Sequence, residues 1–166
     1  MNRKGMFGKK ENYKLDKLQE GFTFKLKGKL WKIIEIGEYD WSGDGRSIEY
    51  NLEDKNRNKA FLEVEYLKGN YEVYFSQEVS IESYMLKEAV NKEEVVFSGN
   101  KFRLEEQYKG AYKNLTNRTS WENLKSYMFY NEEDDILTIE DWGNDTYEAF
   151  YGEEIKVSKI KNITSN

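Results

Sequence analysis

Short segments in which apolar and polar residues alternate recur along most of this chain. Phe22–Lys27 is a clear example, and Leu30–Tyr39 follows it after a turn at Gly28. Alternation with a period of two is typical of a β-strand that buries one face and leaves the other in water. Similar segments predict further strands at residues 47–52, 60–65, 70–75, 95–97, 102–110, 127–130, 136–141, 147–151 and 155–160.

The composition agrees with an all-β fold whose strands are half-buried. Hydrophobic residues make up 38% of the chain and charged residues 34%, so each element is expected to keep one wet face. This favours antiparallel sheets, because the strands of parallel sheets are usually covered on both faces. Aromatic residues reach 16% and are expected to supply much of the core. Residues 80–92 are the only segment that suggests a helix, so at most one short helix is predicted.

Several segments of the first half recur in the same order in the second half. The matching pairs are Phe61–Glu65 with Ile136–Glu140, Tyr71–Val79 with Tyr147–Ile155, Phe24–Leu26 with Phe102–Leu104, and Trp41 with Trp121. An ordered series of matches suggests an internal repeat of one β-meander. We therefore predict two tandem, similar antiparallel meanders that pack as a pseudo-twofold sandwich or as two fused small barrels.

The repeat and the composition together suggest how the chain is divided. Residues 1–17 contain Lys, Gly and Asn without periodicity and are predicted to be a mobile basic tail. Residues 18–92 would form the first meander half and residues 93–160 the second. Residues 161–166 would be a short tail.

Patterned aromatic residues and glycines resemble those of domain-of-unknown-function family 4178. The resemblance covers about residues 18–158. It is carried by Gly21-Phe22-x-Phe24, Gly28-x-x-Trp31, Glu49-Tyr50-x-Leu52, Phe61-Leu62-x-Val64-Glu65, Leu137-Thr138-Ile139-Glu140-x-Trp142, Tyr147-Glu148 and Gly152. It implies no activity and no catalytic residue, so function has to be argued from the residues themselves.

The chain contains neither cysteine nor histidine. Their absence excludes disulfides, thiol nucleophiles, Cys-ligated metals and the commonest general base. The sequence therefore leans against an enzyme, and it predicts no catalytic residue, no metal site and no cofactor. The acidic run Glu132–Asp135 is interpreted as a solvated turn.

Two groups of residues are the candidates for a site. Trp41, Trp121 and Trp142 lie next to predicted turns, with Tyr147 nearby, and loop aromatics of this kind either close the core or stack on a ligand or partner. Glu65 and Glu140 occupy equivalent places near two strand ends. They would suit a carboxylate-dependent hydrolase if both reached one cleft and one had a raised pKa.

The expected function is a non-catalytic binding or scaffolding module that recognises a protein partner. The alternatives are a small-ligand or carbohydrate binder that uses the loop aromatics, and a carboxylate-dependent hydrolase. The net charge of −5 argues against binding of duplex nucleic acid. No segment has the length and apolarity of a membrane span or signal peptide. A cytoplasmic protein is therefore expected, as monomer or homodimer, with peripheral membrane association left open. The richness in Lys, Asn, Glu, Ile and Tyr suggests a prokaryotic source.

Overall fold

The computed structural model describes residues 13–165, which form one antiparallel sheet of 11 strands with one α-helix and two short 3-10 helices. The strands are β1 (Thr23–Leu26), β2 (Lys29–Asp40), β3 (Arg46–Glu53), β4 (Lys59–Leu67), β5 (Asn70–Val79), β6 (Glu94–Phe97), β7 (Asn100–Asn114), β8 (Glu122–Tyr130), β9 (Ile136–Asp141), β10 (Tyr147–Ile155) and β11 (Lys161–Thr164). The helices are η1 (Leu15–Lys17), α1 (Ser83–Lys92) and η2 (Val157–Lys159).

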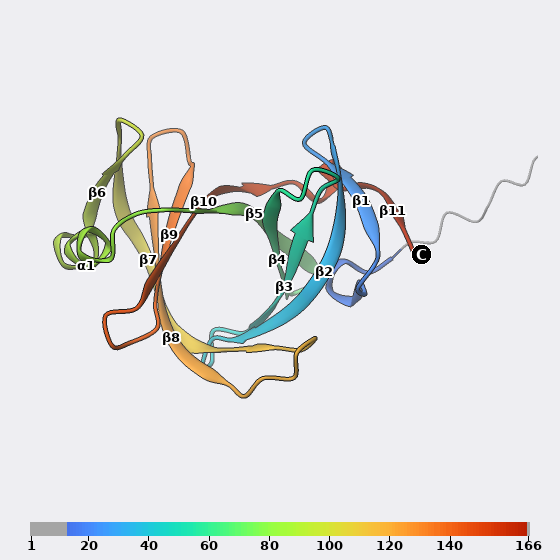
Figure 1. Cartoon of the computed structure of the whole chain (residues 1–166), viewed down its shortest axis with the longest axis horizontal. Helices are drawn as coiled ribbons and strands as arrows, with labels where there is room; N and C mark the ends of the chain where they lie inside the picture. Colours follow the sequence, from blue (N-terminus) through green and yellow to red (C-terminus); the bar gives the residue numbers. More distant parts are fainter. Residues whose placement is uncertain (1–12, 166) are drawn as a thin grey trace, which may run out of the picture.

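The sheet closes on itself. Its order is β11-β1-β2-β3-β4-β5-β10-β9-β8-β7-β6, and β2 also pairs with β7, with Tyr39 opposite Tyr112. The eight strands β2, β3, β4, β5, β10, β9, β8 and β7 therefore form a ring, which Figure 1 shows from one end. Strands β1 and β11 extend the sheet beyond β2, and β6 extends it beyond β7.

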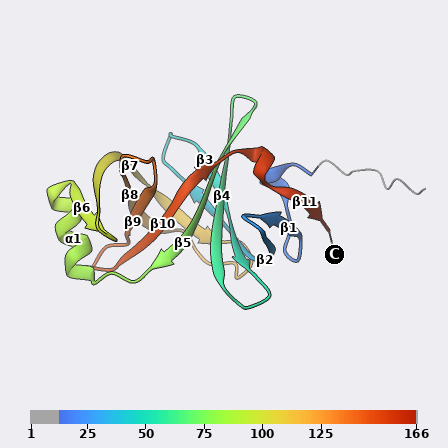
Figure 2. The same ribbon diagram turned by 90° about the horizontal axis from the view of Figure 1, so that it is seen from above.

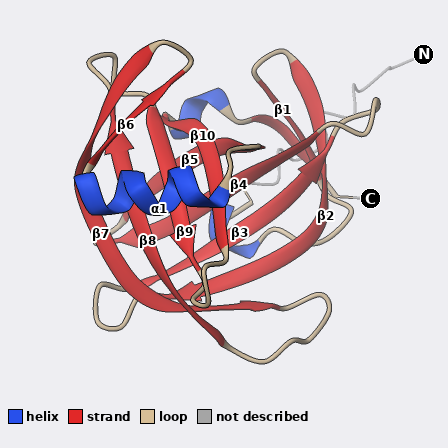
Figure 3. Ribbon diagram, turned by 60° about the vertical axis from the view of Figure 1, so that its left-hand side comes forward, coloured by secondary structure: helices blue, strands red, loops and turns tan. Residues whose placement is uncertain are grey.

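Two hydrophobic cores lie on the outer face of the ring. The first packs β1 and η1 against β2–β5 and includes Phe24, Trp31, Ile33, Tyr50, Leu52, Leu62, Val64 and Val73. The second packs α1 against β7–β10 and includes Leu86, Ala89, Phe102, Phe129, Leu137 and Ile139. Helix α1 crosses the outer face of β7, β8 and β9 (Figure 3). Helix α1 and strand β6 lie at one end of the molecule, and strands β1 and β11 lie at the other (Figure 2).

Glycines permit the closest approaches at the two seams between the halves. A Cβ at Gly110 would overlap the carbonyl oxygen of Asp40, where β7 meets β2. A Cβ at Gly152 would overlap the carbonyl oxygen of Phe75, where β10 meets β5. Side chains at these two positions would push the paired strands apart, so both seams depend on a residue without a Cβ.

The predicted all-β, antiparallel fold with one short helix is confirmed. The two halves join edge to edge in a single sheet, through β5–β10 and β2–β7, rather than face to face. The strand order is mirrored about the β5–β10 pair, which places β1 in correspondence with β6. The sequence match between Phe24–Leu26 and Phe102–Leu104 had instead aligned β1 with β7.

Both predicted tails need correction where they are described. The first 12 residues of the predicted basic tail lie outside the described residues, but Leu15 in η1 is buried in the first core. Residues 161–164 form β11, which pairs with β1 and is not a tail. The predicted strand at 155–160 is also wrong, because β10 ends at Ile155 and η2 follows.

By packing, α1 belongs with the second half, although its residues fall within the predicted first half. No helix among residues 13–165 is long and apolar enough to cross a membrane.

Candidate functional site

The polar faces of the ring strands point inward. On β4, Leu62 and Val64 enter the first outer core, so Glu63 and Glu65 between and beside them face the inside of the ring. On β9, Leu137 and Ile139 enter the second outer core, and Glu140 faces inward. Because side chains alternate along a strand, covering the apolar faces from outside leaves the polar faces around the interior.

This interior contains a cavity of about 320 Å³. Seven carboxylate side chains line it: Asp44, Glu49, Glu63, Glu65, Glu72, Glu106 and Glu140. Five aromatic side chains also line it: Trp41, Phe61, Tyr74, Tyr108 and Phe150. Phe75 borders the cavity, but its ring packs on Trp31 in the first outer core. Both meander halves contribute, since the lining comes from β3, β4 and β5 on one side and β7, β8, β9 and β10 on the other.

Two of the lining carboxylates, those of Glu49 and Glu140, meet at the hydroxyl of Tyr39. This hydroxyl lies 2.8 Å from Oε1 of Glu140 and 3.1 Å from Oε2 of Glu49. Tyr39 is on β2, Glu49 on the neighbouring β3, and Glu140 on β9, so the contact to Glu140 crosses the ring. Glu140 is only 6% exposed. We call these three residues the Tyr39 triad.

A second hydrogen-bonded chain holds Glu63 beside the Tyr39 triad. The indole Nε1–H of Trp41 donates to Oγ of Ser47 at 3.1 Å, and the Ser47 hydroxyl donates to Oε1 of Glu63 at 2.6 Å. The indole of Trp41 stacks on the Tyr39 ring, with centroids 4.7 Å apart and an interplanar angle of 8°. Trp41 therefore holds the Tyr39 ring by stacking and the Glu63 carboxylate through Ser47.

Burial raises the pKa of the carboxyl groups in and beside the Tyr39 triad. Desolvation is the main cause of the shift for Glu140, whose pKa rises to about 8, and neighbouring carboxylates such as Glu63 add to it. Desolvation also raises the pKa of Glu49 and of Glu63. Enclosing like charges together in this way favours the protonated forms of these carboxyl groups.

Other lining carboxylates are more exposed than Glu140. Asp44 and Glu72 are exposed, while Glu65 and Glu106 are half-buried. Burial raises the pKa of Glu65 to about 7, with Glu72 as the next cause. Glu106 accepts hydrogen bonds from the hydroxyls of Tyr108 at 2.6 Å and Tyr130 at 3.3 Å.

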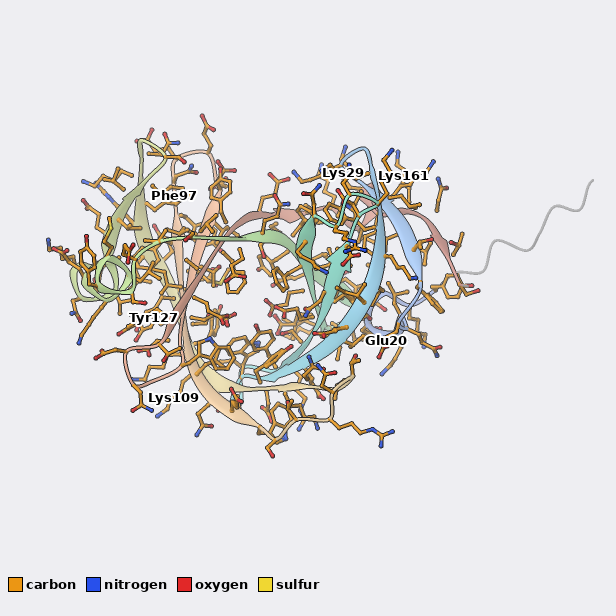
Figure 4. The ribbon with its side chains drawn as sticks, viewed as in Figure 1. Glu20, Lys29, Phe97, Lys109, Tyr127 and Lys161 are labelled. Carbon is orange, nitrogen blue, oxygen red and sulfur yellow. The ribbon has the colours of Figure 1, made fainter. Side chains whose placement is uncertain are left out.

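Basic side chains stay outside the ring. Among residues 13–165, no Lys or Arg lines the cavity. The ion pair between Lys27 and Glu153 lies on the outer face, beside the ring of Phe75. Figure 4 shows Lys29, Lys109 and Lys161 at the periphery of the molecule. The interior is therefore negatively charged without an internal counter-charge.

The carboxylates are spread along the cavity. Within the described part of the chain, no three acidic side chains are grouped so that they could hold a metal ion. The arrangement therefore suits an extended cation better than a single ion held by several oxygens.

Three of the six predicted site residues line this cavity and three do not. Glu65, Glu140 and Trp41 are lining residues, and Trp41 is 7% exposed. Trp121 is 40% exposed, with the ammonium of Lys113 4.5 Å from its ring centroid. The others are half-buried elsewhere: Trp142 packs on Tyr112, and Tyr147 packs against the second outer core.

The sequence reasoning missed most of the acidic lining. Glu49, Glu63 and Glu106 were treated as members of wet strand faces. One signal could have revealed them: Glu63 and Glu65 are both glutamates on the polar face of β4, and the lysine of that face, Lys59, lies at the far start of the strand. On an ordinary solvated face, opposite charges are usually interspersed.

Comparison with known proteins identifies relatives without a described role. The model of a family described as "Domain of unknown function (DUF4178)" matches residues 19–157. An uncharacterized protein from Aquifex aeolicus (strain VF5) is 26% identical over 156 residues, covering 90% of this chain and 84% of the relative. No solved structure matches the chain significantly.

Proposed function

We propose that this chain, which belongs to the DUF4178 family, is a binding module whose ring cavity holds a small organic cation. The observation that carries the proposal is the lining itself, which combines seven carboxylates and five aromatic side chains with no basic residue from the described part of the chain. A small-ligand binder is one of the alternatives that the sequence leaves open. The charge of the cavity gives that alternative a ligand class.

A cation is the ligand charge that this cavity favours. Several of its carboxylates lie close enough to repel one another electrostatically, and this repulsion disfavours their ionisation. An entering positive charge relieves that repulsion. At a separation of ~4 Å and an effective dielectric constant of about 20, one such pair gains about 4 kcal/mol before the cost of desolvation.

The aromatic side chains favour an organic ligand over a bare ion. The Phe61 and Phe150 rings come from β4 and β10 and meet edge to face, with centroids 5.3 Å apart, at the cavity wall. Aromatic faces attract organic cations and cover their apolar parts. A volume of about 320 Å³ is in the range of small-molecule sites.

A panel of probes that share the same six-carbon chain and differ in their head groups tests this proposal. We expect n-hexylamine and 1,6-diaminohexane to bind in calorimetric titrations, and 1-hexanol and hexanoate to bind at least about tenfold more weakly because they bring no positive charge. Failure of both amines to bind at millimolar concentration would contradict the proposed function.

A matched pair of charge reversals on β7 locates the binding. Glu106→Lys places an ammonium at the cavity wall and is expected to weaken amine binding at least about tenfold. Glu105→Lys changes the charge of the neighbouring exposed residue, which does not line the cavity, and is expected to leave affinity within about twofold. Equal effects of the two substitutions would place binding elsewhere.

A carboxylate-dependent hydrolase is a second candidate. It is favoured because Glu65 and Glu140 line the same cavity and both have a raised pKa, which is how an acid catalyst is prepared. Turnover of aryl glycosides that is lost in both Glu65→Gln and Glu140→Gln would support it. A rate equal to the uncatalysed one across an α- and β-glycoside panel would exclude glycosidase activity of this kind.

Recognition of a protein partner, which the sequence favoured first, stays a prediction. Its support is a set of exposed apolar side chains, Tyr84 and Met85 on α1 and Val96 on β6. A partner that co-purifies with the wild-type chain but not with Tyr84→Ala or Val96→Ser would support it. A partner retained equally by both variants would remove this surface from consideration.

A further inference from the structure

We infer that Glu49 and Glu140 form the subsite for an ammonium group of the ligand, and that this ammonium takes the place of a proton held in the Tyr39 triad. The inference rests on the proposed function and adds to it a location, a head-group chemistry and a stoichiometry. It predicts that binding of a protonated amine releases a proton from the protein.

The hydrogen-bond geometry requires a proton beyond that of the hydroxyl. The Tyr39 oxygen is within hydrogen-bond distance of both Glu49 and Glu140. A phenol carries one hydrogen, so it donates to only one of the two carboxyl groups. The other contact is a hydrogen bond only if that carboxyl group carries its own proton and donates it to the phenol oxygen. Two ionised carboxylates would leave one of them facing a lone pair.

Among the described residues, no basic side chain faces the Tyr39 triad to supply a positive charge in place of that proton. The groups that face the Tyr39 triad from other strands are Glu63 on β4, Glu78 on β5, Tyr112 on β7 and Glu148 on β10, and all are acidic. Ser126 on β8, opposite Glu140, cannot ionise in this range. Burial raises the pKa of both Glu49 and Glu140, which agrees with a retained proton.

A primary ammonium can take over the role of the proton. It has three N–H donors, so it can donate to both carboxylates while the Tyr39 hydroxyl donates to one of them. It also supplies the positive charge that allows both groups to ionise. A trimethylammonium head has no N–H donor and cannot bridge the two oxygens. The subsite should therefore prefer a primary amine to its quaternary analogue, although both carry the same charge.

Calorimetry in buffers of different ionisation enthalpy measures the released protons. At about pH 7, n-hexylamine is already protonated, so any proton released on binding comes from the protein. We expect titrations in phosphate and in Tris to give an apparent release approaching one proton per amine. The release should decline above the Glu140 pKa of about 8. We expect n-hexyltrimethylammonium to bind at least about tenfold more weakly.

Substitution of either carboxyl group should abolish the exchange. Glu140→Gln keeps the shape of a protonated carboxyl group but has no proton to release, and Glu49→Gln gives a second variant if the first does not fold. In each we expect proton release close to zero and amine affinity reduced about tenfold or more, whereas Glu105→Gln should behave as wild type.

The outcomes separate this inference from the proposed function. Amine binding without proton release, or equal affinity for the quaternary analogue, would overturn the inference and leave the proposed function intact. Proton release that persists undiminished in both Glu140→Gln and Glu49→Gln would likewise overturn it. Absence of binding by every cationic probe would overturn the proposed function and the inference with it.

Discussion

The hydroxyl of Tyr39 and the carboxyl group of Glu140 meet at 2.8 Å across the inside of the ring, although 101 positions separate them in the chain. Tyr39 belongs to the first meander and Glu140 to the second. The contact therefore exists only when the two halves close around a common interior. It places a buried acid in an interior that receives no Lys or Arg side chain from residues 13–165.

The free energy of unfolding should fall as pH rises from about 4.5 to 8. The folded chain keeps a proton on Glu140 up to a pKa of about 8, while the carboxyl group of the unfolded chain loses it near its ordinary pKa of 4.5. Over that range the native state binds more protons, so each rise in pH favours unfolding, by on the order of 1 kcal/mol per pH unit for a fully shifted group. Urea denaturation at several pH values measures this slope.

Glu140→Gln provides the internal comparison for that slope. It should flatten the dependence because glutamine does not titrate, and the exposed control Glu105→Gln should keep the wild-type slope. A slope that is identical in wild type and Glu140→Gln would show that Glu140 is not the group responsible.

Tyr50→Phe should lower stability by about 1–3 kcal/mol. The Tyr50 hydroxyl donates to the carbonyl oxygen of Leu15 at 2.7 Å and accepts from the amide of Leu18 at 3.0 Å, which fastens η1 over the first core. Removing it leaves two buried backbone groups without a partner. Thermal unfolding measures the loss, and Tyr84→Phe, at a side chain 70% exposed, is the control expected to change little. Equal stability of both variants would contradict the proposed anchoring role.

Gly152→Ala should destabilise the protein more than Gly69→Ala does. A methyl group at Gly152 overlaps the backbone of Phe75 on β5 and forces the β5–β10 seam to open, whereas a methyl group at Gly69 meets nothing within 4 Å. Gly69 has a φ of +84°, so alanine there suffers only backbone strain of about 1 kcal/mol. We expect an additional 1–3 kcal/mol, roughly, at Gly152 from crowding. Chemical denaturation of both variants tests the order.

Cation binding should change tryptophan fluorescence through Trp41. Of the four tryptophans, Trp41 lines the cavity, while Trp31 is in the first outer core and Trp121 lies at the surface. Titration with 1,6-diaminohexane should therefore shift or quench the emission of the wild type. Trp41→Phe should lose most of this signal while Trp121→Phe keeps it. A full signal in Trp41→Phe would mean that the ligand binds away from the cavity.

The positions of the strands could be predicted from local pattern, with errors where tertiary pairing acts. Alternation located β2, β3, β4 and β9 within a few residues. It failed at the C-terminus, where Lys161–Thr164 becomes a strand only because β1 offers an edge to pair with. It also failed to extend β7 to Asn114, where the strand continues because β2 pairs with it. In both places the hydrogen-bond partner is distant in sequence.

The candidate site was predicted only in part, for a related reason. Glu65 and Glu140 were singled out as equivalent strand-end acids, and both line the cavity. Glu49 and Glu63 were not, because a polar strand face is ordinarily the one that meets water. Trp121 was expected to behave like Trp41, yet only Trp41 reaches the interior. Both tryptophans lie next to turns in the sequence, so the local pattern could not distinguish their different surroundings in the folded chain.

The sequence by itself determined that this chain is all-β, which residues belong to each strand face, and that its chemistry has to do without cysteine and histidine. A two-residue period separates the faces of every strand without stating which face will be enclosed. The tertiary structure decided that, because β2 pairs with β7 and the flanking elements β1, η1 and α1 cover the apolar faces from outside. Ring closure thereby turned glutamates such as Glu49 and Glu63 from a solvated surface into the lining of a cavity.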